Sequence, residues 1–288
     1  MSAVLHRRQG RVLIAPLTVF LLAMLALPLA IDVVYAVSRV TFETLRAPRF
    51  EGIGNFVTVL KDGSFWNAMG FSLRFAVLAS TAQIVVGLAL AIFLAPLFAL
   101  APWLLAVLML PMMLAPALVG LMYRLLLQDF VGIVPNTWTL LFGDSPAFLN
   151  PGNAFWTLVV IEALQWTPFA LLILWSAYAA IPADITEAAA LDGAGPLRRL
   201  RHVELPWMAP TIAVTFFFRF IDSFRVFDNV YVLTGAGAGG STTTISIFIY
   251  EAFFRRNDIG VAVAASLVLL ALSFAALYGL VRLAGARR

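Results

Sequence analysis

Six long apolar segments constrain what this chain can fold into more than any other feature of its sequence. They are Val12–Val37, Gly70–Leu94, Trp103–Leu127, Phe155–Ala180, Trp207–Leu233 and Ile259–Leu283. A helix needs about 20 apolar residues to cross a bilayer, and lipid admits only helices or closed barrels because it cannot hydrogen-bond exposed backbone groups. Barrel strands are about 10 residues long with alternating polarity, a pattern that these segments lack. The sequence therefore predicts an all-α polytopic membrane protein with six transmembrane helices.

Prolines occur within or at the edges of several segments, at positions 16, 28, 111, 116, 168 and 210. Membrane helices tolerate proline when neighbouring helices satisfy the freed backbone groups. We therefore expect each segment to continue past its prolines as one transmembrane helix.

The composition agrees with a chain whose surface mostly faces lipid. Hydrophobic residues make up 62% of the sequence and charged residues 12%, whereas soluble domains contain about 45–50% apolar and about 25% charged residues. The net charge of +4 fits arginines at cytoplasmic loops and lipid headgroups better than a nucleic-acid surface. With no cysteine and only His6 and His202, disulfides and three-histidine metal sites are excluded. We predict no catalytic residue, no metal site and no nucleic-acid partner.

The first apolar segment follows a basic N-terminus and could be mistaken for a cleaved signal peptide. The apolar stretch of a signal peptide is about 7–15 residues long, whereas Val12–Val37 is long enough to cross a bilayer. We interpret it as a first transmembrane helix that also serves as an uncleaved signal anchor.

Arginine and lysine positions predict the orientation of the chain, because cytoplasmic loops carry an excess of these residues. With the N-terminus inside, nine basic residues lie on the cytoplasmic side and six on the other side. An even number of spans then places both termini in the cytoplasm. The expected organisation is a cytoplasmic N-terminus (1–11), a first transmembrane helix (12–37), a periplasmic loop (38–69), a five-helix core (70–283) that contains a cytoplasmic loop (181–206), and a cytoplasmic tail (284–288).

The loop between the fourth and fifth segments carries the most informative motif, within IPADITEAAALDGAGPLRRLRHVELPWMAP. Pro182 and Asp184 favour a helix start, through proline in the first turn and a negative charge at the positive end of the helix dipole. Asp192 and Gly193 should end that helix, because glycine adopts a left-handed conformation at little cost. Pro196 should begin a second helix. The sequence predicts a cytoplasmic helix–turn–helix that lies along the membrane.

This loop resembles the coupling loop of permeases from binding-protein-dependent ABC importers. The matching positions are Glu187, Ala188, Ala189, Asp192, Gly193, Ala194, Leu205 and Pro206. A loop with a DG turn is often only structural, but the full spacing between the fourth and fifth of six spans favours the coupling interpretation. In that family the loop docks into a cleft of a cytoplasmic ATPase, which implies that Glu187 and Gly193 provide the contact and the turn. An aromatic residue often found in the second short helix is replaced here by Leu197 or Leu200.

The resemblance covers about Val12–Leu283 and extends to the maltose-type carbohydrate branch of type I importers, through Phe218–Thr234, Gly52–Asn55 and Phe65–Asn67. It implies a multi-pass protein of the bacterial inner membrane with three kinds of partner. These are a second homologous permease, two cytoplasmic ATPase subunits and a periplasmic or extracellular solute-binding protein. The chain has no GxxxxGK[ST] motif, so we expect it to bind no cofactor itself and a partner to use the ATP.

Polar residues inside the predicted spans are candidates for the translocation path, because placing them in lipid is costly. They are Tyr123, Glu162, Gln165, Trp166, Arg219, Asp222, Arg225 and Asn229. On one continuous fifth helix the last four would lie within about 120° of one another, and residues three apart could form ion pairs, whereas Asp228 would point elsewhere. An ion-pair ladder that only fixes the helix is an equal alternative. Gln83 is as easily explained by an interhelical hydrogen bond.

The expected solute is a sugar or polyol, with a glycerol-phosphate-type or other small polar solute as the alternative. Arg219 and Arg225 would suit an anionic solute, but each has an acidic residue within reach. A secondary transporter would leave the coupling loop unexplained and would be expected to show inverted repeats. An intramembrane enzyme would need a nucleophile–base pair or a metal cluster, which the spans do not offer.

Overall fold

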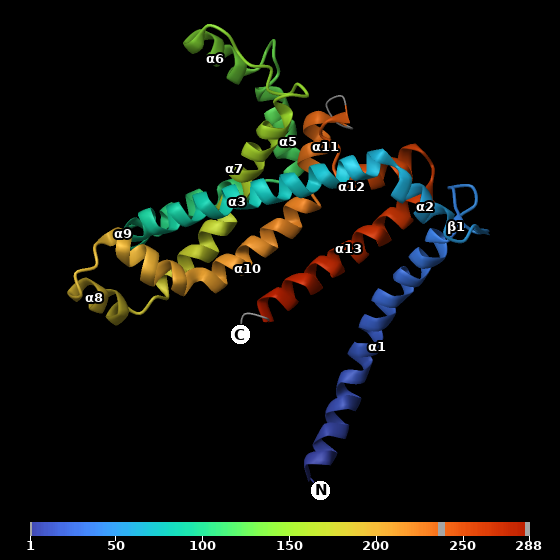
Figure 1. The fold of residues 1–288 in the computed structure, drawn as a ribbon, viewed down its shortest axis with the longest axis horizontal. Coiled ribbons are helices and arrows are strands. Elements are labelled where there is room, and N and C mark those ends of the chain that lie inside the picture. The colour runs from blue at the N-terminus through green and yellow to red at the C-terminus, as the bar shows by residue number, and fades with distance from the viewer. Residues whose placement is uncertain (1, 236–239, 286–288) are drawn as a thin grey trace. The chain divides into compact units, whose positions relative to one another are not determined.

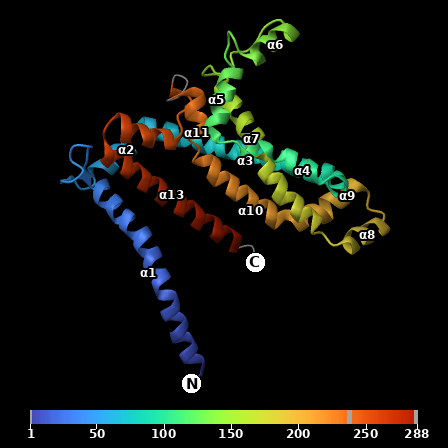
Figure 2. The same cartoon turned by 180° about the vertical axis from the view of Figure 1, so that it is seen from behind.

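The computed structural model describes residues 2–235 and 240–285, and these residues are predominantly helical (Figures 1 and 2). Most of the predicted tail and of the glycine-rich stretch 235–240 lie outside the described residues. Three described helices contain stretches long and apolar enough to cross a membrane: Ile14–Ala36, Gly63–Phe98 and Ala154–Ala179. Two shorter apolar helices are Pro116–Leu126 and Ile259–Ala275. The predicted helical membrane architecture is therefore confirmed in its coarse form.

The chain divides into two compact units, which are Met1–Trp66 with Phe248–Arg288 and Asn67–Ile247. The first unit contains α1 (Ser2–Ala36), β1 (Ser38–Arg39), β2 (Arg49–Phe50), α2 (Gly54–Lys61), a π-helix (Glu251–Arg255) and α13 (Ile259–Gly285). Strands β1 and β2 pair in antiparallel fashion with Ser38 opposite Phe50. Asn55 donates from Nδ2 to the carbonyls of Ala36 and Ser38, both at 2.9 Å, and so fixes the end of α1.

The second unit holds the remaining elements, apart from the residues of α3 and α12 that cross its boundaries. They are α3 (Gly63–Leu100), α4 (Trp103–Leu108), η1 (Leu110–Met113), α5 (Pro116–Leu126), α6 (Ile133–Phe142), α7 (Ala154–Ala179), α8 (Ala183–Leu191), α9 (Pro196–Arg199), η2 (Leu200–Glu204), α10 (Leu205–Phe224), α11 (Asp228–Thr234) and α12 (Ile245–Tyr250). Helix α7 packs against α10, and α5 packs against α11.

Two apolar clusters make up the interior of the second unit, and they lie at different levels along the same helices. One includes Phe75 of α3, Leu158 of α7 and Val230 of α11. The other includes Ile84 of α3 and Leu171 of α7, together with Met208 of α10. On α3, α7 and the α10–α11 segment, the residues between these two levels carry most of the buried polar groups. The polar side chains therefore form a layer between two apolar layers.

The prediction that Trp103–Leu127 forms one continuous helix is wrong. It contains α4, the 3₁₀ turn η1 and α5, with Leu114 and Ala115 extended at ψ 138° and 133°. Proline disfavours helical geometry in the residue before it and has no N–H to donate, so Pro116 begins a new helix instead of continuing the old one.

The prediction that Trp207–Leu233 forms one continuous helix is also wrong. Helix α10 ends at Phe224, and α11 begins at Asp228 after a three-residue break. Asn229 is therefore not on the same helix as Arg219, and the common polar face predicted for the fifth span does not exist as such. The break instead turns the start of α11 back toward α7.

Candidate functional site

The polar layer of the second unit collects buried side chains from four helices. Helix α7 contributes Glu162, Gln165 and Trp166, which share one helix face because they are three and four residues apart. Gln83 comes from α3, Arg219 from α10 and Asn229 from α11. Apart from Trp166, which is half-buried, each of these side chains is buried.

Arg219 is the centre of this layer and is 2% exposed. Its Nε donates to Gln83 Oε1 at 2.7 Å, its Nη1 to Asp222 Oδ2 at 2.7 Å and its Nη2 to Glu162 Oε1 at 3.3 Å. The guanidinium also lies 4.6 Å from the ring centroid of Trp166. A buried charge is tolerated only when it is paired and hydrogen-bonded, and here the protein supplies both.

Asn229 extends the network from Arg219 to the break in the third apolar segment. Its Nδ2 donates to Glu162 Oε2 at 3.0 Å and to Gln165 Oε1 at 2.9 Å. Gln165 in turn donates from Nε2 to the carbonyl of Leu114 at 3.1 Å. This carbonyl lies in the extended stretch before α5, so the network compensates for the helical bond lost there.

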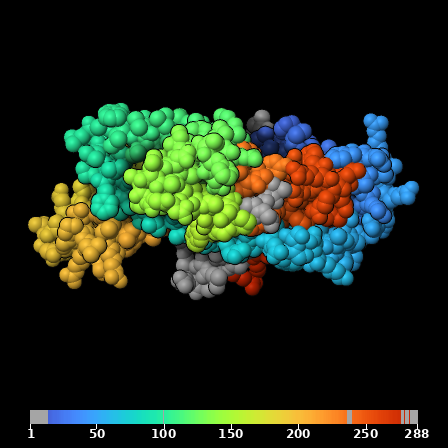
Figure 3. All heavy atoms as spheres, turned by 90° about the horizontal axis from the view of Figure 1, so that it is seen from above, coloured from blue at the N-terminus to red at the C-terminus, as the bar shows by residue number. Residues whose placement is uncertain are grey.

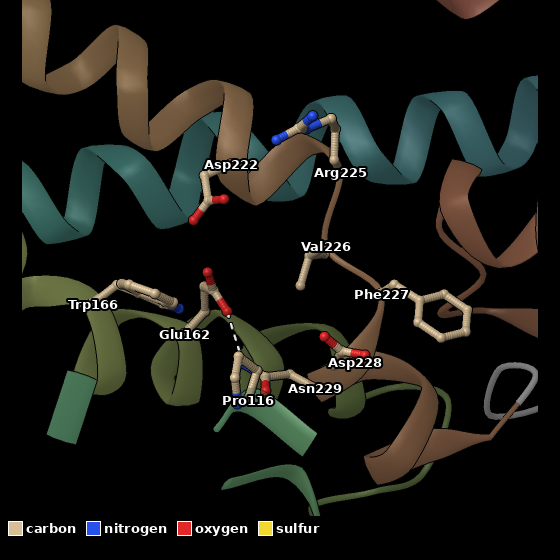
Figure 4. A pocket seen from close by; sticks show the side chains of 9 residues that line it. All are labelled: Pro116, Glu162, Trp166, Asp222, Arg225, Val226, Phe227, Asp228 and Asn229. Carbon is tan, nitrogen blue, oxygen red and sulfur yellow. Dashed lines mark hydrogen bonds between the residues drawn. The ribbon is translucent and has the colours of Figure 1, made fainter. Parts of the chain in front are cut away.

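A cavity of about 330 Å³ adjoins the polar layer (Figure 4). Its lining residues are Pro116, Glu162, Trp166, Asp222, Arg225, Val226, Phe227, Asp228 and Asn229. The carboxylates of Asp222 and Glu162 point toward each other across this space. Both helix breaks contribute to the wall, through Pro116 and the segment from Arg225 to Phe227. The breaks therefore contribute non-helical residues to the cavity wall.

The structure brings most of the predicted path residues together, with some corrections. Five of the eight line the cavity: Glu162, Trp166, Asp222, Arg225 and Asn229. Arg219 and Gln165 lie in the network behind the wall, whereas Tyr123 packs against the apolar cluster around Phe75.

Two expectations for charged residues of the fifth segment can be compared with the geometry. The Arg219–Asp222 ion pair forms, but no Asp222–Arg225 ion pair is present among the described residues. The prediction that Asp228 points elsewhere is wrong, because Asp228 lines the cavity. The break between α10 and α11 changes the direction of Asp228. The sequence does not predict this break, because the stretch contains no proline. Within the described residues, no group of acidic and histidine side chains could hold a metal ion.

The loop at 181–206 forms the predicted helix–turn–helix. Helix α8 begins after Pro182, and Gly193 adopts a left-handed φ of +75°. The N–H of Ala194 donates to the carbonyl of Ala189 at 3.0 Å, which closes the helix end. Glu187 is exposed, and so are Leu191 at 90% and Leu197 at 78%. In Figure 3 the loop (gold) forms a projecting end of the second unit.

The loop continues into α10 without an interruption of helical structure. Helix α9, the π-helix η2 and α10 follow one another without a break, so the second helix of the loop is the beginning of the long helix. Arg199 Nε donates to Glu204 Oε1 at 2.7 Å, and Glu204 is 2% exposed. The second helix of the loop and the helix that carries Arg219 are therefore one continuous helical segment.

Comparisons with known proteins show which family this chain resembles. Residues 68–287 match the family described as binding-protein-dependent transport system inner membrane component. The chain is 31% identical over 275 residues to the trehalose/maltose transport system permease protein MalF of Thermococcus litoralis, covering 93% of this chain and 92% of that protein. It is 30% identical over 268 residues to the trehalose transport system permease protein SugA of Mycobacterium tuberculosis, covering 93% and 86%.

The fold is also similar to a chain in the crystal structure of a bacterial alginate ABC transporter in complex with an alginate pentasaccharide-bound periplasmic protein. The TM-score is 0.78 at 19% identity, and the match covers 94% of this chain and 93% of that chain. At this identity the likeness shows a shared fold.

Proposed function

Because the chain belongs to the family of binding-protein-dependent transport system inner membrane components, we propose that it is the permease subunit of an ATP-driven importer of a sugar or polyol. It is a transport subunit and not an enzyme. The observation that carries the choice of solute is the cavity, whose wall combines the polar groups of Glu162, Asp222 and Asn229 with Trp166. Such groups suit the hydroxyls and the apolar ring face of a sugar. The names of the relatives, trehalose and maltose permeases, support the same class.

In this proposal the translocation path passes the polar layer. Glu162, Trp166, Asp222, Arg225 and Asn229 face the solute. Arg219 and Gln165 hold the side chains of the cavity wall in position. Tyr123 would contact the solute only in another conformational state, because here it packs against the apolar cluster around Phe75. Both helix breaks support this role, because irregular backbone at membrane depth is tolerated where it lines a cavity.

The proposed topology has six transmembrane segments with both termini in the cytoplasm of a bacterium, in its inner membrane. Helices α1, α3 and α7 would each cross as a single helix. The α4–α5 and α10–α11 segments would cross as broken helices, and α13 would be the sixth span. The loop that contains α8 and α9 then lies on the cytoplasmic side, as ATPase docking requires.

Docking of the loop onto an ATPase would provide the coupling. Glu187, Ala188, Ala189, Asp192, Gly193 and Ala194 form α8 and its turn, and Leu205 and Pro206 begin α10. Leu191 and Leu197 of this loop are exposed, and exposed apolar surfaces often mark interaction sites. The proposed assembly contains a second homologous permease, two ATPase subunits and a solute-binding protein. ATP would be bound by the ATPase subunits, with no cofactor on this chain.

Alternating access would then follow from the continuous helical connection between the loop and α10. Closure of the ATPases would move α8 and α9, and α10 would shift Arg219 and the cavity wall with them. Each access state needs its own set of contacts, and the hydrogen bonds of the polar layer would be those of one state.

The test is uptake by the complex of this chain with its partner permease, ATPase and binding protein in proteoliposomes. A panel of radiolabelled sugars and polyols is offered with and without ATP. We expect ATP-dependent uptake of at least one of them, loss of that uptake in Glu187→Ala, and retention in the control Asp184→Ala, an exposed acid of the same helix. Uptake without ATP, or an unchanged Glu187→Ala variant, would contradict the proposal.

A further inference from the structure

The cavity offers a solute many hydrogen-bond acceptors and few donors. Carboxylates of Glu162, Asp222 and Asp228 contribute acceptor oxygens to its lining, whereas Arg225 is the one cationic residue among the lining residues. Figure 4 shows the Arg225 side chain extending away from Asp228 and Asn229. The donors of Asn229 Nδ2 are already used by Glu162 and Gln165. A solute that binds here must therefore bring its own donors.

One buried atom points to such a solute independently of the charges. Asn229 is 3% exposed, and its Oδ1 has no hydrogen-bond partner in the described part of the chain. The orientation of the Asn229 amide is fixed by its two partners, which are both oxygen atoms. Exchanging Nδ2 and Oδ1 would lose both hydrogen bonds, because Oδ1 has no hydrogen to donate. A buried acceptor without a partner is costly and usually explained by a missing donor. A hydroxyl of a bound solute would supply it.

The charges near the cavity leave it formally acidic. Arg219 is shared between Glu162 and Asp222, so that two carboxylates have one guanidinium. Asp228 and Arg225 add one charge of each sign. Three carboxylates against two guanidiniums give a formal charge of −1, which repels an anion and not a neutral solute.

From these observations we propose that the cavity selects an uncharged, hydroxyl-rich solute and rejects sugar acids and phosphorylated polyols. This inference rests on the proposed function and narrows its substrate class. It distinguishes this chain from the fold relative whose cargo is described as the acidic polysaccharide alginate. Trp166 provides the apolar part of the wall, and the free Oδ1 of Asn229 accepts from a hydroxyl. Two charged lining residues determine the charge selectivity in opposite directions. Asp228 disfavours an anionic solute, and Arg225 favours one.

The experiment measures solute binding to the permease–ATPase complex in lipid nanodiscs without the binding protein, because the binding protein has a selectivity of its own. The probes are methyl glucoside, methyl glucuronide and methyl glucosaminide, which share one ring and differ in charge. Dissociation constants come from ligand-observed NMR. We expect the glucuronide to bind roughly tenfold more weakly than the glucoside, and the glucosaminide to bind at least as well as the glucoside.

Two variants of exposed lining residues test the assignment with opposite expectations. Asp228→Asn should reduce the gap between glucoside and glucuronide to about threefold or less, and Arg225→Gln should widen it by about the same factor. Asn229→Ala should weaken all three probes alike. A glucuronide that binds wild type as tightly as the glucoside would overturn charge selection. So would Asp228→Asn and Arg225→Gln variants that shift all three probes equally.

Failure of this inference can be told apart from failure of the proposed function. If no probe binds while the full complex imports a sugar in an ATP-dependent manner, the cavity is not the solute site and this inference is wrong. If the full complex imports no sugar or polyol at all, the proposed function itself is wrong.

Discussion

The polar layer and the proposed coupling loop at 181–206 differ in how far their side chains are buried. In the polar layer, Arg219, Glu162 and Asn229 are each at most 3% exposed and bind one another. In the loop, Leu191 and Leu197 are apolar and almost fully exposed. The layer is stabilised by contacts within the chain, whereas the exposed leucines of the loop are typical of an interaction site. Substitutions in the layer should therefore affect stability first, and substitutions in the loop should affect assembly and transport.

The largest effect on stability is expected from Arg219→Met. This change leaves the buried carboxylate of Glu162 without its cation, and breaking one side of a buried ion pair costs about 3–5 kcal/mol. Unfolding midpoints of the purified protein in detergent would measure it. The control is Arg74→Met. Arg74 is an exposed arginine of α3 whose Nε donates to the carbonyl of Gly70 in the same helix, and the change should alter stability by less than about 0.5 kcal/mol. Equal losses in both variants would contradict the central role of Arg219.

The double variant Arg219→Met with Glu162→Leu sharpens this prediction. Replacing both members of a buried pair by apolar residues is often close to neutral, so at least half of the lost stability should return. Asp222 loses its partner as well, but its side chain is 49% exposed and remains solvated. The double variant should nevertheless take up no sugar, because Glu162 lines the cavity. A double variant as unstable as the single one would show that other contacts of Arg219 dominate.

A smaller effect is expected at the turn of the coupling loop. Gly193 has a φ of +75°, where a residue with a Cβ costs about 1–2 kcal/mol. Gly193→Val should reduce sugar-stimulated ATP hydrolysis by the reconstituted complex. Gly195→Val is the matched control, since Gly195 has a φ of −62° and neither position has an atom within 4 Å of an added Cβ. Similar activities of the two variants would show that the turn geometry does not matter for coupling.

The base of the loop should be less sensitive than the polar layer, although it also contains a buried acid. Arg199→Gln removes the cation that faces Glu204, but the Arg199 side chain is 35% exposed and solvent screens the pair. We expect a loss of about 1 kcal/mol or less, measured as the unfolding midpoint. Arg198→Gln, an exposed neighbour without an ion pair in the described chain, is the control. A loss as large as that of Arg219→Met would remove the contrast between the two regions.

The smallest effect on stability, with a clear effect on assembly, is expected for Leu191→Ser. Leu191 is 90% exposed, so the variant should keep its unfolding midpoint within about 0.5 kcal/mol. It should nevertheless retain less ATPase during affinity purification of the complex. Leu140→Ser, at 86% exposure on α6, tests whether any exposed leucine has this effect. Normal ATPase retention in Leu191→Ser would argue against an apolar docking surface.

The two regions also differ in how well the sequence predicts them. The loop was predictable because its signals are local: Pro182 starts a helix, Gly193 ends it and Pro196 starts the next. These signals depend on backbone geometry alone and need no knowledge of neighbouring helices. The bounds of α8 and the left-handed glycine follow directly from them.

The polar layer was predictable in its composition but not in its geometry. Pro168 and Pro210 lie inside helices, whereas Pro116 begins one, so a proline in an apolar run does not by itself predict a break. What differs is the tertiary partner, since Gln165 binds the carbonyl that the break at Leu114 leaves free. No local signal marks the break before Asp228, and the position of this residue in the cavity wall was therefore missed.

The π-helix at Leu200–Glu204 determines the direction in which the loop projects from α10. A π-turn amounts to one residue inserted into an α-helix, and each residue of an α-helix turns the chain by about 100°. The azimuth of α8 and α9 about the axis of α10 therefore depends on a single backbone insertion. Removing one residue between positions 200 and 204 would keep every side chain of α8 and α9 but rotate both helices about the axis of α10 by about 100°.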